Sequence, residues 1–328
     1  MFLTTLIVGS LITVSSNSWM GMWIGLEINL LSIIPLLSAN EQTNSAEASI
    51  KYFITQVIAS NIILMAIICM FYFNEQIYGN FNLTMMMQSA LFIKMGAAPF
   101  HAWFPEVMEG LSWFNCLLIL TWQKIAPMLI LMTLIKQEIF VYLVILSSSM
   151  IGSIMGFNQL SLRKIMSYSS INHIGWMIAA MINAKSIWMI YFLVYSLITI
   201  NIVLIFSSMK VKNIAQISSL FKINKLSSLM FSMNFFSLGG LPPFLGFLPK
   251  WLTIQQMVYA ENYFIALMMI LLTMIAMFFY LRLALVPMTL MNSITLIKFS
   301  TTTNFIIYFS NIISLMALLT VGVFLNPF

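Results

Sequence analysis

The chain of 328 residues is 61% hydrophobic and only 7% charged. Because soluble domains carry about 25% charged residues, this composition excludes a soluble globular protein. The net charge of +6 comes from basic residues scattered between apolar runs, which argues against nucleic acid as a partner and indicates a role in membrane topology.

The apolar runs are continuous over about 20 residues, the length that a helix needs to cross a bilayer. Barrel strands would instead alternate polar and apolar side chains. We therefore expect an all-α polytopic membrane protein of about eleven transmembrane helices. In chain order the predicted spans are residues 2–16, 19–38, 50–73, 84–104, 111–135, 139–157, 165–183, 187–209, 226–249, 262–286 and 302–325.

The basic loop residues lie mostly on one predicted side of the membrane. Loops on the other side offer only Lys136 and Lys185. By the positive-inside rule, the basic side and the N-terminus are predicted to face the cytoplasm or matrix, and an odd helix count places the C-terminus on the opposite side. The basic side carries Arg163, Lys164, Lys210, Lys212, Lys222, Lys225 and Lys298.

Two predicted spans contain similar Gly- and Pro-rich stretches. Gly96–Glu106 reads G-A-A-P-F-H-A-W-F-P-E, and Gly240–Lys250 reads G-L-P-P-F-L-G-F-L-P-K. Proline removes a backbone donor and clashes with the preceding turn, so each stretch predicts a broken helix beside a wet internal cavity. Two kinked helices that coincide by chance are the alternative.

The spacing between these stretches also superimposes other predicted spans. A shift of 144 positions (from 96 to 240) lays residues 2–16 on 146–160, 19–38 on 163–182 and 111–135 on 255–279. An odd number of helices per repeat inverts the second copy, as in many transporters. We expect one membrane domain, 1–328, built from inverted five-helix repeats in 1–136 and 137–287 and a C-terminal helix in 288–328.

Four charged residues are predicted to lie within the membrane: Glu27, Lys94, Lys124 and Lys250. A charge at the centre of a span costs about 2.5–3.5 kcal/mol on insertion scales, so each needs a reason. Glu27 has a structural ion pair or a protonated carboxyl as its alternative. Lys94 and Lys124 lie about ten residues from either end of their spans, beyond the reach of a snorkelling stem. Lys250 is nearer a membrane face and has an interfacial anchor as its alternative. Together the four charges suit proton transfer.

Two histidines lie close to these features. His101 follows the first predicted break, and His173 lies in the polar cluster S-Y-S-S-I-N-H-I-G-W. Imidazole can relay protons at physiological pH. A buried, hydrogen-bonded histidine without such a role is the alternative for each. Glu106 and Glu109 are predicted to be solvated, and the basic stretch 210–225 is predicted to be a surface segment that could contact anionic lipid.

Motifs for nucleotide, iron–sulfur or haem binding are not visible, so neither a cofactor nor a metal site is predicted in this chain. Any redox chemistry would lie elsewhere. Only one acid lies deep in the predicted membrane region, which argues against a sodium site.

Five motifs together resemble the antiporter-like subunit family of mitochondrial respiratory complex I, the NADH:ubiquinone oxidoreductase, over nearly the whole chain. They read G-L-E-I-N-L-L, I-K-M-G-A-A-P-F-H-A-W-F-P-E, T-W-Q-K-I-A-P, S-L-R-K-I-M-S-Y-S-S-I-N-H-I-G-W-M and L-G-G-L-P-P-F-L-G-F-L-P-K-W. The resemblance implies that Glu27 is the family's key glutamate, Lys94 its partner, Lys124 the central lysine and Lys250 the lysine near the outer exit.

The resemblance also implies a proton-translocating subunit of an enzyme whose FMN, iron–sulfur clusters and ubiquinone site belong to other subunits. Chains 4L and 4, accessory subunits and phospholipid including cardiolipin would be its neighbours in the mitochondrial inner membrane. A stand-alone cation/proton antiporter and a non-pumping structural spacer of the membrane arm are the alternative functions.

Overall fold

The computed structural model describes residues 1–38, 43–73, 81–135, 139–209, 211–220 and 225–289. The chain divides into two compact units, Met1–Ser148 and Ser149–Phe328. Within the described ranges the regular structure is helical, apart from an isolated antiparallel bridge between Ser161 and Asn213.

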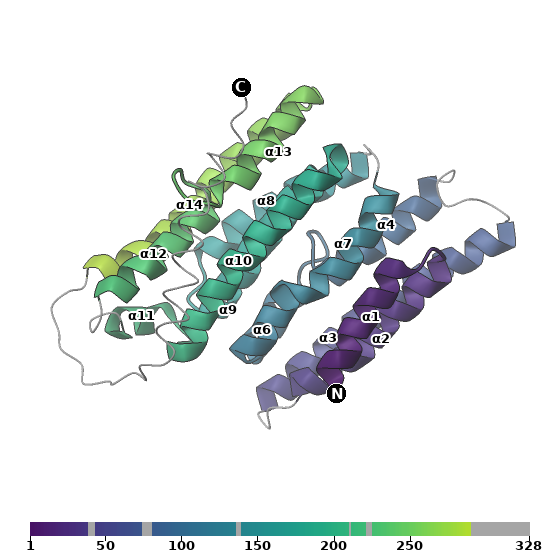
Figure 1. The fold of residues 1–328 in the computed structure, drawn as a ribbon, viewed down its shortest axis with the longest axis horizontal. Coiled ribbons are helices and arrows are strands. Elements are labelled where there is room, and N and C mark those ends of the chain that lie inside the picture. The colour runs from purple at the N-terminus through teal and green to yellow at the C-terminus, as the bar shows by residue number, and fades with distance from the viewer. Residues whose placement is uncertain (39–42, 74–80, 136–138, 210, 221–224, 290–328) are drawn as a thin grey trace. The chain divides into compact units, whose positions relative to one another are not determined.

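Most of the described helices follow the predicted spans, but those at Trp103–Gly110, Ile214–Leu220 and Phe247–Tyr259 lie largely outside them (Figure 1). Their bounds are α1 Phe2–Ser15, α2 Trp19–Ser38, α3 Thr43–Phe73, α4 Phe81–Met95, α5 Trp103–Gly110, α6 Trp113–Leu120, α7 Trp122–Leu134, α8 Ile139–Phe157, α9 Leu162–Asn183, α10 Lys185–Met209, α11 Ile214–Leu220, α12 Lys225–Gly239, α13 Phe247–Tyr259 and α14 Tyr263–Thr289.

Six helical segments in the described part are long and apolar enough to cross a membrane. They are Trp19–Ser38, Thr43–Tyr72, Trp113–Leu134, Ile139–Phe157, Lys185–Met209 and Tyr263–Leu285. The prediction of an all-helical chain with several membrane spans is therefore confirmed. The count of eleven stays a prediction, and the predicted span 302–325 lies outside the described residues, as do Lys136, Lys210, Lys222 and Lys298.

Three local features differ from the hydropathy reading. Helix α3 begins at Thr43 rather than at residue 50, because its polar first turns are helical although they are not apolar. The predicted span 111–135 is interrupted at Thr121, whose hydroxyl donates to the Leu117 carbonyl at 2.7 Å. Such a bond competes with the backbone ladder and bends helices. The basic stretch 210–225 contains the short helix α11, which packs against α14.

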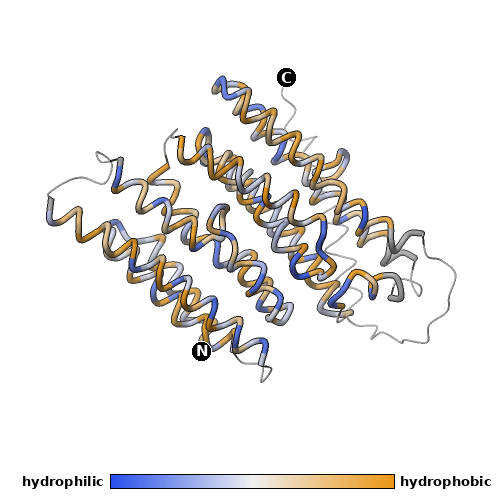
Figure 2. Tube along the Cα trace, turned by 180° about the vertical axis from the view of Figure 1, so that it is seen from behind, coloured by the Kyte–Doolittle hydropathy of each residue, from blue (hydrophilic) through white to orange (hydrophobic). Residues whose placement is uncertain are grey.

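In the first unit, α1 packs on α2, α2 on α3, α3 on α4 and α5, and α4 on α7. One face of α1 remains exposed through apolar side chains at helical spacing: Leu3, Ile7, Leu11 and Val14. Hydrophobic residues likewise dominate most of the described helices (Figure 2). An exposed apolar face of this kind suits contact with lipid chains.

In the second unit, α9 is the central helix, and almost all its residues are buried. It packs against α10, α13 and α14. A helix that is buried on every side needs its polar groups satisfied internally. The hydroxyls of Ser167, Ser169 and Ser170 donate to carbonyls one turn earlier in α9, at 2.7–2.8 Å.

The first predicted break separates α4 from α5. Helix α4 ends at Met95, and α5 begins at Trp103. Between them Gly96 has φ +74°, a backbone conformation that side chains disfavour, and the Ala98–Pro99 peptide bond is cis. Proline at position 99 cannot donate to the helical ladder, so the helix does not continue.

The second break separates α12 from α13 in the same way. Helix α12 ends at Gly239, and α13 begins at Phe247. Here Gly240 has φ +81°, and the Pro242–Pro243 bond is cis. The left-handed glycine therefore falls at the corresponding position of both stretches, and neither span is a continuous helix.

Candidate functional site

At the first break, neutral side chains donate hydrogen bonds to backbone carbonyls at the end of α4. The indole Nε1 of Trp103 donates to the Ile93 carbonyl at 3.1 Å, and Gln56 Nε2 donates to the Lys94 carbonyl at 3.5 Å. Helices leave their last carbonyls without internal partners, and at membrane depth each needs another donor. The Ile93 and Lys94 carbonyls near the C-terminal end of α4 thus accept hydrogen bonds from neutral side chains.

The amine of Lys94 lies in the interior beside this break. Its side chain is only 8% exposed. It lines a small cavity of about 20 Å³ between α2, α3, α4 and α7. The cavity walls are formed by Leu26, Asn29, Leu30, Tyr52, Gln56, Lys94, Gln123 and Pro127.

Glu27 lies in α2, which contributes to the same cavity wall. Its carboxylate interacts electrostatically with Lys94, but in the described part of the chain no direct ion pair joins the two. Its Oε1 atom is buried and has no hydrogen-bond partner among the described residues. The predicted pair is therefore close enough to interact, yet it is not held as a contact salt bridge.

Lys124 lies in α7 and is 1% exposed, one of the largest fully buried side chains among the described residues. Its ammonium lies 5.6 Å from the ring centroid of Phe104, in the half-helix that follows the first break. An ammonium over an aromatic face gains a favourable cation–π interaction. The structure thus places Lys94 before the first break and Lys124 against the helix after it.

Lys250 covers the carbonyls of the second break itself. Its Nζ donates to the Gly239 carbonyl at 2.6 Å and to the Leu238 carbonyl at 3.3 Å. These are the last carbonyls of α12, where the helix dipole is negative, so a cation is stabilised there. The ammonium also lies 5.9 Å from the Trp176 ring. The side chain is 7% exposed, which does not fit the alternative of an interfacial anchor.

The two histidines differ in environment. His101 is partly exposed and donates from Nδ1 to the Pro99 carbonyl within the first break, at 3.2 Å. His173 is buried in α9, and its Nδ1 is hydrogen-bonded to the Tyr191 hydroxyl at 2.9 Å. Tyr195 lies against the same imidazole, with ring centroids 5.2 Å apart. Of the two, His173 has the enclosed polar surroundings that a relay needs.

The polar residues around Lys94 were not singled out from the sequence. Asn29 lies two positions after Glu27, and Gln123 directly precedes Lys124, so both stand inside motifs already noted. The intramembrane residues were selected by their charge, and a neutral amide carries none, so these two residues were passed over. An uncharged amide at the centre of a span was the available signal, because it too needs partners in the membrane.

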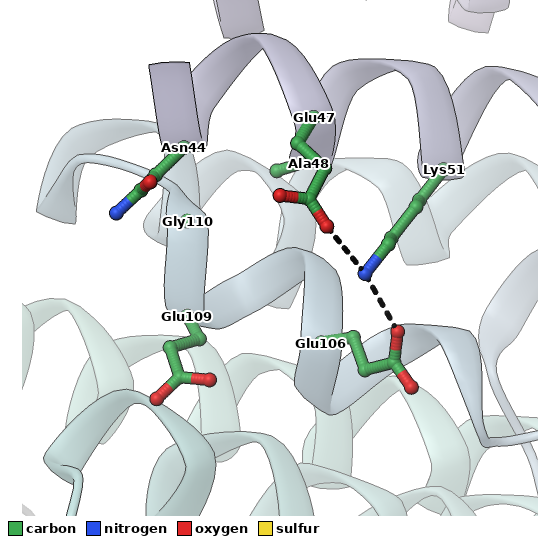
Figure 3. A pocket seen from close by; sticks show the side chains of 7 residues that line it. All are labelled: Asn44, Glu47, Ala48, Lys51, Glu106, Glu109 and Gly110. Carbon is green, nitrogen blue, oxygen red and sulfur yellow. Dashed lines mark hydrogen bonds and ion pairs between the residues drawn. The ribbon is translucent and has the colours of Figure 1, made fainter. Parts of the chain in front are cut away.

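A charged pocket of about 510 Å³ lies between the start of α3 and α5 (Figure 3). Lys51 lies 2.9 Å from Glu47 and 3.0 Å from Glu106. Glu106 is exposed, as predicted, but it is also paired. Because the three side chains are exposed, solvent and salt weaken these ion pairs. The pocket is lined by Asn44, Glu47, Ala48, Lys51, Glu106, Glu109 and Gly110.

Comparison with known proteins identifies the family. The sequence profile of the NADH:quinone oxidoreductase/Mrp antiporter transmembrane family matches residues 16–276. NADH-ubiquinone oxidoreductase chain 2 of Anopheles gambiae is 51% identical over 287 residues, 86% of this chain and 84% of that protein. The protein of the same name from Locusta migratoria is 43% identical over 285 residues, 87% of this chain and 83% of that protein.

Two solved structures share the fold. A chain of respiratory complex I from Thermus thermophilus, solved with bound aureothin, has a TM-score of 0.87 at 22% identity and covers 98% of this chain and 78% of its own. A chain of the Mrp complex from Dietzia sp. DQ12-45-1b has a TM-score of 0.78 at 16% identity, with 91% and 61% covered. The identities and coverage of the relatives show that the chain belongs to the NADH-ubiquinone oxidoreductase chain 2 proteins, within the NADH:quinone oxidoreductase/Mrp antiporter family.

Proposed function

We propose that the chain is a proton-translocating, antiporter-like core subunit of respiratory complex I in the mitochondrial inner membrane. The observation that carries this proposal is the burial of Lys94, Lys124 and Lys250 beside two broken helices. A buried ammonium at membrane depth is costly and marks ion or proton paths. An amine can also take up and release a proton without leaving its place, which suits a relay.

In this proposal, quinone reduction in other subunits changes the interaction between Glu27 and Lys94. Weakening the carboxylate's attraction favours loss of the Lys94 proton, because burial disfavours the charged amine. The proton then passes to Lys124, and release to the outer side takes place through Lys250. FMN, the iron–sulfur clusters and ubiquinone are assigned to other subunits, and this chain performs no redox step.

The arrangement in the membrane belongs to the same proposal. We assign eleven helices, inverted repeats in residues 1–136 and 137–287, a matrix-side N-terminus and an intermembrane-side C-terminus. The left-handed glycines at 96 and 240 support the repeat, because the same backbone device recurs in each stretch. Chains 4L and 4, accessory subunits and cardiolipin are the proposed neighbours.

The decisive experiment uses the complete, NADH-oxidising complex reconstituted into vesicles. Lys124→Met is expected to lower the number of protons moved per electron, because the buried amine is removed while the side-chain volume is nearly kept. Lys185→Met, at an exposed position at the start of α10, is the matched control and is expected to keep the wild-type ratio. An unchanged ratio in Lys124→Met would remove the residue from the path and favour a structural spacer.

A further inference from the structure

A chain of hydrogen bonds links three of the helices that line the cavity beside Lys94. Gln123 Nε2 in α7 donates to Asn29 Oδ1 in α2 at 2.8 Å. The Tyr52 hydroxyl in α3 donates to Gln123 Oε1 at 3.5 Å. Gln123 is therefore the central member, with one bond to each neighbouring helix.

Members of this network also contact residues beside the break between α4 and α5. Gln56 lies one turn after Tyr52 in α3, lines the same cavity and donates to the Lys94 carbonyl. The Tyr52 ring also lies edge-on to the Trp103 ring at 5.7 Å, and the Trp103 indole covers the neighbouring Ile93 carbonyl. Through Gln56 and Tyr52, the network therefore contacts residues on both sides of the first break, Lys94 and Trp103.

The size and lining of the cavity fit a single water molecule. A water needs about 10–15 Å³ of free volume and two to four polar partners. The cavity measures about 20 Å³, and its lining residues are one lysine, three amide residues, one tyrosine and the apolar Leu26, Leu30 and Pro127. Side-chain amides offer both donors and acceptors, so they can hold a water in either orientation.

We propose that this cavity is a water-binding site beside Lys94, and that Gln123 and Asn29 are positioning residues that orient its water for proton transfer. The proposal rests on the proposed function. In the step, an N–H bond of the Lys94 ammonium breaks as an O–H bond of the water forms. A second O–H bond of that water breaks, and its proton forms a new N–H bond on the unprotonated amine of Lys124.

Neutral partners suit this role better than charged ones. A carboxylate in place of Gln123 would hold the proton or pair with the Lys94 ammonium, whereas an amide does neither at physiological pH. Of the residues that line the cavity, only Lys94 and Tyr52 are titratable, and phenol ionises only near pH 10. Among the residues that line this cavity, the Lys94 amine is therefore the group that holds the proton at physiological pH.

The experiment compares three variants in the assembled complex. Gln123→Leu and Asn29→Leu remove the amides that orient the water. Gln88→Leu removes a buried amide of α4 that donates to the Leu134 carbonyl at 3.2 Å and does not line the cavity, so it is the matched control. The measurement is NADH oxidation coupled to proton uptake, per assembled complex, in H₂O and in D₂O.

Coupled NADH oxidation is expected to fall about tenfold in Gln123→Leu and Asn29→Leu, the effect of losing one or two hydrogen bonds in the transfer step. Its solvent isotope effect is expected to rise, because proton transfer becomes limiting. Gln88→Leu is expected to keep the wild-type isotope effect. Equal losses in all three variants with an unchanged isotope effect would make the network merely structural and overturn the inference.

A density map of the wild-type complex decides the matter even if a variant fails to assemble. A water peak within hydrogen-bond distance of Lys94 Nζ and of an amide of Asn29 or Gln123 is expected, and an empty cavity at a resolution that shows other internal waters overturns the site. If Lys124→Met lowers the proton-to-electron ratio while Gln123→Leu behaves as wild type, only this inference fails. If Lys124→Met has no effect, the proposed function fails first.

Discussion

Replacing Lys250 by Met tests whether this amine supports the second helix break. Methionine keeps a similar length and volume, but it removes the donors to the Gly239 and Leu238 carbonyls. A buried acceptor that loses its donor costs about 1–3 kcal/mol. The first bond is short at 2.6 Å and the second is long at 3.3 Å, so we expect a loss of about 3 kcal/mol for both together.

This loss should appear as more frequent local opening of the end of α12. Three kcal/mol corresponds to about a 150-fold change in an opening equilibrium. The reporters are the amide of Gly240, which donates to the Phe236 and Ser237 carbonyls, and the amide of Leu241, which donates to Phe236. Hydrogen–deuterium exchange of the assembled complex, read on peptides that cover these amides, measures the change.

Lys94→Met is the matched control, since it makes the same substitution beside the other break. There Gln56 and Trp103 cover the exposed carbonyls, so exchange of the peptide around Gly96 is expected to stay near the wild-type rate. Similar acceleration at both breaks, or none at the second, would refute the reasoning that Lys250 holds the end of α12.

Two further predictions concern groups outside the breaks. Tyr191→Phe removes the hydroxyl bonded to His173 and is expected to lower coupled NADH oxidation about fivefold if that bond orients the imidazole for relay, whereas Tyr263→Phe at an exposed position should have no effect. An unchanged rate in Tyr191→Phe would leave this bond without a catalytic role. Lys51→Ala breaks the exposed pairs with Glu47 and Glu106, and both the thermal unfolding midpoint and NADH oxidation are expected to stay unchanged, because solvent screens such pairs. A clear loss of stability at low salt would contradict this.

The helix breaks were predictable because their cause is local. Pro99 and Pro243 interrupt the helical ladder wherever they stand, and the glycines before them permit the turn. The burial of Lys94 and Lys124 was equally accessible, because each stands too far from the ends of its span for its stem to reach water.

The partners of these residues were not predictable from the same evidence. Lys250 bonds to backbone carbonyls, which every residue type carries, so no sequence letter identifies them. The pair between Lys51 and Glu106 joins positions 55 apart, and only the tertiary fold brings them together. The bond between Gln123 and Asn29 is of the same long-range kind.

Helix boundaries were missed where hydropathy and hydrogen bonding disagree. The start of α3 is polar but helical, so an apolar window begins too late. Thr121 lies in an apolar run, yet α6 ends directly before it, and its hydroxyl and backbone N–H both donate to the Leu117 carbonyl. In both places the backbone follows its hydrogen bonds rather than the average polarity of the segment.

At the first break neutral side chains bond the backbone carbonyls, whereas at the second break Lys250 bonds them. In the proposed relay, Lys94 and Lys250 would therefore affect the backbone differently. Trp103 and Gln56 bond the Ile93 and Lys94 carbonyls, so in the proposed relay a change in the protonation of Lys94 would leave these backbone bonds in place. Lys250 itself donates to the Gly239 and Leu238 carbonyls, so in the proposed relay a change in its charge would also change the hydrogen bonds that hold the end of α12.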